Sequence, residues 1–306
     1  MSQHPPPPKK LIIIAGPTAV GKTAIAVKLA QQLNTAIISA DSRQFYREMS
    51  IGTAKPDVQE LSQAKHYFID SHSIIENFTV GDFEKEALQL LDNLFQENDH
   101  VIMAGGSGLF IRAVTQGFDD LPIAEEPIRT RLNQEFTDKG ITYLQEQLKN
   151  VDPDYYIQVD LQNPQRLIRA LEVFETTGKP FSSFRRDAVN ERPFDCIKIG
   201  LNLPRDVLYD RINQRVDLMI EQGLVDEVRS LIPYRHLNAL NTVGYSELFD
   251  YFAGKTDIDT AINLIKQNTR RFAKRQLTWF RKDKDIQWME ANDPGLLDKI
   301  AKTIVY

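Results

Sequence analysis

The feature that most constrains this chain is the segment GPTAVGKT at residues 16–23, which matches the pattern G-x-x-x-x-G-K-[ST] at every position. A short apolar run precedes it at residues 11–15, and apolar residues with helical spacing follow at residues 23–33. A strand, a glycine-rich turn and a helix in this order predict a phosphate-binding loop, because backbone N–H groups at a helix N-terminus form a cradle for anions. The loop consists of Gly16, Pro17, Thr18, Ala19, Val20, Gly21, Lys22 and Thr23.

Lys22 is expected to bring a positive charge to the phosphate oxygens, and the Thr23 hydroxyl is expected to be a ligand of Mg²⁺. The loop identifies an anion but not a reaction. A nucleotide-hydrolysing protein of this class also needs a magnesium-holding acid after a second buried strand, whereas the apolar residues 101–104 are followed by Gly-Gly-Ser-Gly. This argues against a motor protein or a GTPase and leaves a small-molecule kinase open.

Strand-like and helix-like segments alternate along the first part of the chain, with short strands at residues 35–39 and 101–104 and a helix at residues 83–95. This alternation predicts an α/β fold with a doubly wound parallel sheet and a site at the carboxyl edge of the sheet. We expect a disordered Pro-rich tail at residues 1–9, the first part of the core at 10–120, and a mainly helical insertion domain at 121–195. Residues 196–306 are expected to complete the core and to end in basic helices.

Composition excludes several classes of protein. The single cysteine, Cys196, excludes an internal disulfide framework and a cysteine-based zinc site, and it favours a reducing compartment such as the cytoplasm. The apolar run after the prolines is too short for a signal sequence or a membrane span, so no membrane association is expected. The net charge of -5 argues only weakly against nucleic-acid binding, since the position of the charges matters more than their sum.

Asp41 follows the second short strand, where its carboxylate would point toward the phosphate-binding loop. It is a candidate general base or magnesium contact. The alternative is an ordinary turn or helix-capping aspartate, a role that Ser42 can also fill.

Basic residues gather near the end of the chain, where residues 266–284 carry eight Lys or Arg and one acid. On a helix, Arg270, Lys274 and Arg281 would form an outward stripe, while Ile265, Phe272 and Trp279 would face the core. Such a run is either a solvated surface or a polyanion-binding face, and the scarcity of acids favours the second. Smaller pairs of arginines are Arg166 with Arg169 and Arg211 with Arg215, of which the latter suits a diphosphate or a surface salt bridge.

Several stretches together resemble the tRNA dimethylallyltransferase family, also called the tRNA isopentenyltransferase family, in its bacterial type. The stretches occur in the family order and span most of the chain; they are GPTAVGKT (16–23), SADSRQFYREMSIGTAKP (39–56), AGGSGLF (104–110), NPQRLIRALEVFETTGKPFS (163–182), RVDLMIEQGLVDEV (215–228), NTVGYSEL (241–248) and RRFAKRQLTWFR (270–281).

The resemblance implies transfer of a dimethylallyl group from dimethylallyl diphosphate to N6 of the adenosine 3′ of the anticodon in tRNA, with Mg²⁺. On this basis the loop would hold a diphosphate leaving group, Asp41 would take the N6 proton, and Thr23, Lys22 and Arg215 would steady the diphosphate. The resemblance also implies tRNA contacts by Asp41, Ser42, Arg43, Gln44, Ser107, Arg129, Gln165, Arg166, Leu167, Ile168, Arg169, Asn241, Thr242, Val243, Gly244, Tyr245, Ser246, Lys274, Arg275, Gln276, Leu277, Thr278, Trp279, Phe280 and Arg281, with Ser107 and Arg129 in nearby loops.

Three alternatives stay open at this level. A P-loop kinase for a nucleoside or small metabolite would use the same loop, Asp41 and arginines. A related enzyme would prenylate free adenine nucleotides, which would leave the basic helix without a purpose. A non-catalytic nucleotide switch that binds RNA is the third. Apart from the tRNA anticodon stem-loop and the prenyl donor no partner is indicated, and the chain is expected to act as a monomer.

Overall fold

The structure is a computed structural model that describes residues 8–117, 122, 126–185 and 190–305. By its internal contacts the chain divides into two compact units, an α/β unit formed by Met1–Thr115 and Arg192–Tyr306 and a helical unit formed by Gln116–Glu191. Most of the predicted tail, residues 1–7, lies outside the described residues. Lys9 was expected to belong to that tail, but its carbonyl accepts a 2.8 Å hydrogen bond from Asp195 and its Nζ atom lies 2.9 Å from Asp99.

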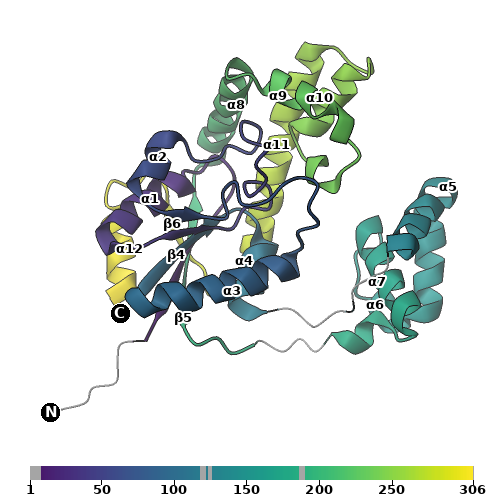
Figure 1. Cartoon of the computed structure of the whole chain (residues 1–306), viewed down its shortest axis with the longest axis horizontal. Helices are drawn as coiled ribbons and strands as arrows, with labels where there is room; N and C mark the ends of the chain where they lie inside the picture. Colours follow the sequence, from purple (N-terminus) through teal and green to yellow (C-terminus); the bar gives the residue numbers. More distant parts are fainter. Residues whose placement is uncertain (1–7, 118–121, 123–125, 186–189, 306) are drawn as a thin grey trace. The chain divides into compact units, whose positions relative to one another are not determined.

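The α/β unit is built on a parallel sheet, and in the described part of the chain the strand order is β3-β2-β4-β1-β5-β6 (Figure 1). In the register of the sheet, Ala15 lies opposite both Gly105 and Gly200, so the carboxyl ends of the central strands meet at one edge. The doubly wound parallel sheet expected from the sequence is confirmed. The strands are β1 (Lys10–Ala15), β2 (Ile37–Ser39), β3 (His66–Tyr67), β4 (His100–Gly105), β5 (Asp195–Asn202) and β6 (Gln287–Glu290).

Alternating side chains of β1 enter two separate hydrophobic cores, one on each face of the sheet. Leu11 and Ile13 belong to one core and Ile12 and Ile14 to the other, as expected for a strand that is covered on both faces. The first core packs against α3 (Val80–Glu97), α4 (Gly108–Gln116), α9 (Leu224–Ser230) and α10 (Tyr245–Phe252), and the second against α1 (Lys22–Leu33), α12 (Leu296–Val305) and the first half of α8 (Arg205–Glu221). Figure 1 shows α1 and α12 on the same side of the sheet.

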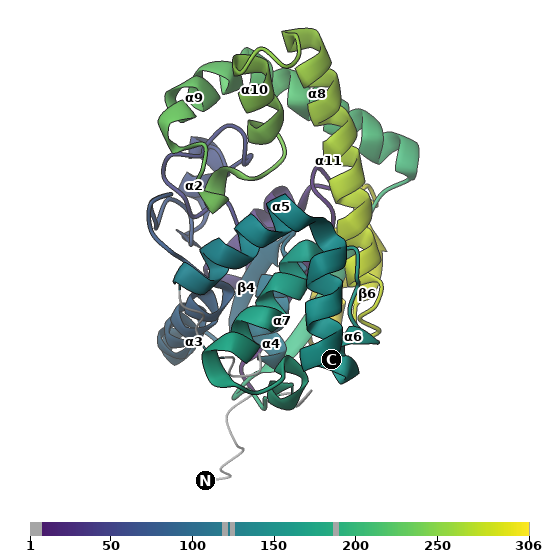
Figure 2. The ribbon, with the colours of Figure 1, turned by 90° about the vertical axis from the view of Figure 1, so that its right-hand side faces the viewer.

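The long helix α11 (Ile258–Phe280) contributes to both cores, through Ile265 and Phe280 on one side and Ala273 on the other. It covers most of the basic segment at residues 266–284, in agreement with the helix expected there. It contacts both α8 and α10, and Figure 2 shows these three helices together in one part of the α/β unit. Shorter elements complete this unit: α2 (Val58–Gln63) and the 3-10 turns η2 (Ile232–Tyr234) and η3 (Asn238–Leu240).

The helical unit contains α5 (Glu126–Val151), α6 (Pro153–Tyr156), α7 (Pro164–Thr177) and the 3-10 turn η1 (Phe181–Phe184). Helix α5 is kinked at Gly140, where φ is 78°. Helix α7 begins after Asn163, whose side chain accepts from the Arg166 amide, and ends at Gly178 with φ 70°. The insertion was placed at 121–195; its last residues instead belong to the α/β unit, where Arg192 pairs with Glu84 at 2.5 Å.

Candidate active site

The turn between β1 and α1 has the backbone that the GPTAVGKT segment requires. Ala19 and Gly21 adopt left-handed φ values of 64° and 105°, and Gly21 precedes the first turn of α1. Glycine at this position brings no side chain to the amide groups of that turn, so these N–H groups stay open to an anion. The predicted phosphate-binding turn is therefore present in the backbone.

Lys22 lies back along this turn, where its Nζ atom donates a 2.8 Å hydrogen bond to the Pro17 carbonyl. Burial lowers its pKa to about 8; the positive charge of Arg215 acts in the same direction, and the carboxylate of Asp41 opposes it. The environment of Lys22 therefore destabilises its charged form as long as no anion is bound. A bound anion would raise the pKa of Lys22, because an opposite charge nearby favours the ammonium form.

Asp41 follows β2 and lines the same cavity as Lys22 and Thr23. Its Oδ1 atom accepts a 3.0 Å hydrogen bond from the Arg43 amide, so it also closes a turn, as the alternative interpretation proposed. Burial raises the pKa of Asp41, although the Arg43 amide and the charge of Lys22 partly oppose this shift. A carboxylate with a raised pKa is a better proton acceptor than an ordinary surface aspartate.

Both arginines of the pair on α8 face the loop. Arg215 lines the cavity, and burial lowers the pKa of its guanidinium against the opposing charges of Glu60 and Asp41. Arg211 donates a 3.4 Å hydrogen bond from Nη1 to the Val20 carbonyl. The sequence pattern could not show that Arg215 lines the cavity whereas Arg211 bonds to the loop backbone. Residues four apart share a helix face, but the spacing does not show what each one contacts.

The strand β4 carries no acid at its carboxyl end, in agreement with the sequence. A Cβ atom at Gly105 would lie 2.0 Å from the carbonyl oxygen of Ala40, so the close approach of the segment after β2 requires glycine there. Ser107 follows, and its Oγ atom accepts a 2.9 Å hydrogen bond from the Ser42 amide. The Gly-Gly-Ser-Gly turn therefore supports the segment that carries Asp41.

These groups line one cavity of about 870 Å³ that lies wholly within the α/β unit. It is large enough for a diphosphate-bearing donor and a nucleobase together. Its walls come from the phosphate-binding loop, the segments after β2 and β4, helices α8 and α11, and the segment before α10. Of the residues singled out in the sequence, the lining includes Thr18, Ala19, Gly21, Lys22, Thr23, Asp41, Ser42, Arg43, Gln44, Ser107, Arg215, Asn241, Thr242, Val243, Gly244, Ser246, Arg275 and Gln276.

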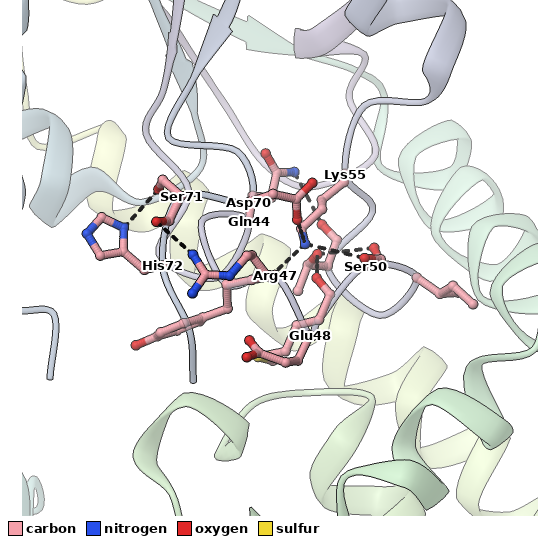
Figure 3. Close-up of polar contacts among 12 residues, drawn as sticks. Gln44, Arg47, Glu48, Ser50, Lys55, Asp70, Ser71 and His72 are labelled. Carbon is pink, nitrogen blue, oxygen red and sulfur yellow. Dashed lines mark hydrogen bonds and ion pairs between the residues drawn. The ribbon is translucent and has the colours of Figure 1, made fainter. Parts of the chain in front are cut away.

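A polar network holds the segment between β2 and α2 in place (Figure 3). The Nε2 atom of Gln44 donates to the carbonyls of Thr53 and Ala54 at 3.2 and 3.1 Å. Lys55 donates to the Tyr46 carbonyl at 2.6 Å and forms an ion pair with Asp70. The side chain of Gln44 therefore has partners within the protein. These contacts hold in place the segment that forms this wall of the cavity.

Sequence reasoning missed Glu227, which also stabilises the segment between β2 and α2. Its carboxylate accepts hydrogen bonds from the amides of Ser50, Ile51 and Gly52 at 3.0, 2.8 and 3.0 Å. It also accepts a 2.6 Å hydrogen bond from the hydroxyl of Tyr245, which is fully buried. Three successive amides on one carboxylate require the folded loop, so no spacing in the sequence indicates this contact.

Gln276 also has a role other than the expected one. It is 7% exposed, its Oε1 atom accepts from the Thr18 amide, and its Nε2 atom donates to the Gly106 carbonyl, both at 2.9 Å. A glutamine at this place joins the phosphate-binding loop to the turn after β4. Its side chain is a structural clamp and not a free group for RNA.

Other parts of the expected tRNA-binding set are corrected in the same way. The side chains of Tyr245 and Phe280 are buried in the α/β unit, and those of Leu167 and Ile168 in the helical unit. Leu277 and Trp279 pack partly buried against the cores, whereas Lys274, Thr278 and Arg281 are exposed. The buried hydrophobic residues of these segments anchor them to the cores, and the exposed polar residues beside them stay available to a ligand.

The expected orientation of α11 is wrong for two residues. Phe272 is 39% exposed and lines the cavity, although Ile265, one heptad earlier, is buried. Arg270 is not on an outward stripe, because its Nη1 atom donates a 2.6 Å hydrogen bond to Asn213 on α8. The heptad spacing predicts that Ile265 and Phe272 share a helix face. Along that face the core ends, and Phe272 borders the cavity instead.

In the helical unit, Arg129 and Arg169 meet at one buried carboxylate. Arg129 lies in the first turn of α5, not in a loop as expected, and its Nε and Nη2 atoms donate to Glu172 at 2.5 and 3.1 Å. Arg169 approaches the same carboxylate at 3.5 Å and donates to the Pro122 carbonyl at 2.9 Å. Gln165 and Arg166 are exposed on α7. These two guanidinium groups and one carboxylate together carry a net charge of about +1.

Comparison with known proteins agrees with this geometry. The family model described as IPP transferase matches residues 44–283. The chain is 55% identical to the tRNA dimethylallyltransferase of Christiangramia forsetii over 96% of this chain and 98% of the relative, and 51% identical to that of Cytophaga hutchinsonii over 97% and 96%. The crystal structure of the full-length tRNA isopentenylpyrophosphate transferase from Bacillus halodurans has a TM-score of 0.68 at 36% identity, covering 97% of this chain and 100% of that one. This chain therefore belongs to the IPP transferase family.

Proposed function

We propose that this protein transfers the dimethylallyl group of dimethylallyl diphosphate to N6 of the adenosine 3′ of the anticodon in tRNA, with release of diphosphate. The observation that carries the proposal is the single cavity in which Lys22, Arg215 and the open amides of the phosphate-binding loop lie across from Asp41. The names of the relatives, tRNA dimethylallyltransferases that align over nearly the whole chain, support the same activity.

In the proposed reaction, N6 of the adenine attacks the allylic carbon of the donor. The N6–carbon bond forms as the bond from that carbon to the diphosphate oxygen breaks, and its electron pair leaves with the diphosphate. Asp41 accepts the N6 proton, which a delocalised aromatic amine releases only as its bond to carbon forms. Lys22, Arg215 and the loop amides neutralise the charge that develops on the leaving group. Confinement in one cavity orients the two substrates.

Magnesium is the cofactor we propose for this site. The Thr23 hydroxyl lines the cavity, and it is an oxygen donor of the kind that Mg²⁺ prefers. Among the described residues no three acidic, histidine or cysteine side chains gather to hold a metal ion. This donor set fits an ion that shares its coordination with substrate diphosphate oxygens. When bound, Mg²⁺ would supply further charge neutralisation to the diphosphate.

We propose that the tRNA also contacts the exposed basic residues of α11 and of the helical unit, and that the protein acts in the cytoplasm, where tRNA is used. No helix in the described ranges has both the length and the apolarity needed to cross a bilayer. We propose further that the protein acts as a monomer.

The test incubates the protein and Mg²⁺ with labelled dimethylallyl diphosphate and either unmodified tRNA or AMP, and separately with γ-labelled ATP and nucleosides. Label in tRNA, located at the adenosine 3′ of the anticodon, is the expected result. Label in AMP alone would assign the enzyme to free nucleotides. Transfer of the terminal phosphoryl group of ATP would support a kinase, the alternative that the phosphate-binding loop allows but that the relatives do not favour.

A further inference from the structure

Phe272 is an exposed aromatic residue in the wall of the cavity. It lies on the face of α11 that also presents Ile265, Asn268, Thr269 and Gln276 to the cavity. Its side chain is 39% exposed, whereas aromatic residues on helices of the α/β unit, such as Phe83 and Phe110, are mostly in the core. An aromatic ring that faces both a cavity and solvent is available to a ligand.

The position of Phe272 relative to the phosphate-binding loop follows from the helix. Gln276 is hydrogen-bonded to the Thr18 amide, so this turn of α11 is fixed beside the loop. Phe272 precedes Gln276 by four residues, which corresponds to about 6 Å along the helix axis. The ring therefore lies one helical turn from the loop that we assign to the diphosphate.

The surroundings of the ring are basic. The guanidinium of Arg275 lies 5.7 Å from the centroid of the Phe272 ring, in a cation–π contact. Arg271 and Lys274 are exposed beside it. Within the described part of the chain neither of these two nor Arg275 has an acidic partner, whereas Lys266 on the same helix pairs with Asp217.

We propose that Phe272, together with Arg275, forms a stacking platform for an unpaired base that flanks the reactive adenosine of the RNA. The proposal rests on the proposed function and assigns to Phe272 a base contact that the sequence did not indicate. An aromatic face with an adjacent guanidinium suits a nucleobase, and free cations around it suit the phosphates that a base brings along. A five-carbon prenyl chain would instead favour an apolar surface shielded from water. This ring is exposed to water and has the Arg275 guanidinium beside it.

The test compares Phe272→Leu with Phe272→Tyr. Leucine keeps an apolar side chain of similar size but has no aromatic face, whereas tyrosine keeps the face. The dissociation constant of an anticodon stem-loop is measured by gel shift at fixed salt, and the KM for dimethylallyl diphosphate by transfer assay. Phe252→Leu is the matched control, because Arg229 lies 5.4 Å from the Phe252 ring in a similar pair that is not part of the cavity lining.

We expect Phe272→Leu to weaken stem-loop binding about five- to tenfold, the lower end of the cost of one lost base stack because leucine keeps an apolar contact, while the KM for the donor is unchanged. Phe272→Tyr and Phe252→Leu should bind like the parent protein. Two further stem-loops each carry one abasic nucleotide, either 5′ or 3′ of the reactive adenosine. With one of these two, the parent and Phe272→Leu should bind equally, because the stacked base is already missing.

Unchanged stem-loop affinity in Phe272→Leu overturns the proposal, as does a rise in the donor KM alone, which would place the prenyl chain on the ring. An undiminished effect with both abasic stem-loops also overturns it. Absence of any prenyl transfer by the parent protein would instead contradict the proposed function, so the two failures are distinguishable.

Discussion

The backbone amide of Thr18 donates a 2.9 Å hydrogen bond to the Oε1 atom of Gln276, which lies 258 positions later in the chain. The same side chain donates to the Gly106 carbonyl at 2.9 Å. One buried amide group thus joins the phosphate-binding loop, the turn after β4 and the basic helix α11. Because each side of the amide is already bonded, the three segments keep a fixed spacing before any substrate binds.

Replacement of this clamp by Gln276→Leu should raise the KM for dimethylallyl diphosphate and lower the free energy of unfolding by about 1–3 kcal/mol, because the part-buried N–H of Thr18 and the buried carbonyl of Gly106 lose their partners. Gln276→Glu keeps an acceptor for Thr18 and loses the donor to Gly106, so an intermediate effect is expected. Urea unfolding and donor titration measure both quantities. Gln267→Leu, on an exposed position of α11, is the control; an equal effect there would contradict the clamp.

Asp41→Asn should reduce transfer by about 10²–10⁴-fold, because an amide of the same shape cannot accept the N6 proton. Binding of the stem-loop should be nearly unchanged, since the substitution preserves size and polarity. Single-turnover transfer and gel-shift affinity are measured on the same preparation. Loss of affinity in parallel with activity would remove the support for a base role.

The pH dependence of kcat/KM for the donor should fall as the pH rises through about 8, the pKa of Lys22 in the free enzyme. Burial has lowered this pKa from 10.5, so the ammonium loses the charge that attracts the diphosphate well before an ordinary lysine would. Lys22→Arg, which stays charged, should lack this decline in whatever activity it retains. Lys28→Arg, on the exposed side of α1, is the control, and a flat profile to pH 10 in the parent would contradict the assignment.

Tyr245→Phe removes the hydroxyl that donates to Glu227 at 2.6 Å and should lower the free energy of unfolding by about 1–3 kcal/mol. Glu227→Gln should cost at least as much, because its carboxylate also holds three amides of the loop at residues 50–52. Thermal unfolding and kcat/KM for transfer are measured together. Glu221→Gln, exposed at the end of α8, should match the parent. Equal stability of all four proteins would show that the loop does not depend on Glu227.

Lys274→Ala and Arg281→Ala should each weaken stem-loop binding and reduce the slope of log affinity against log salt by about 0.7–1, the value expected for one lost phosphate contact. Both side chains are exposed at the end of α11. Lys85→Ala, exposed on α3, is the control for a general change of net charge. A slope equal to that of the parent in either variant would place that residue away from the RNA.

Much of the fold could be predicted from the sequence. The parallel strands, the helix after the loop and the helical insertion follow from local spacing, because a buried strand and an amphipathic helix have different periods. The sequence does not indicate the strands β3 and β6, because β3 has only two residues and the QWME sequence of β6 has no apolar alternation. Their strand conformation depends on pairing with β2 and β5, which are distant in sequence.

The sequence by itself determined the phosphate-binding loop, the place of Asp41 at a strand end and the basic character of α11, because each depends on residues close together in the chain. Only the tertiary structure decided which of these side chains face the cavity. Ile265 and Phe272 have the same heptad position, yet one is buried and the other exposed, because the neighbours that cover a helix face come from distant segments. For the same reason Glu227 and Gln276 became visible as clamps only after the loop at residues 50–52 and the phosphate-binding loop had been brought against them.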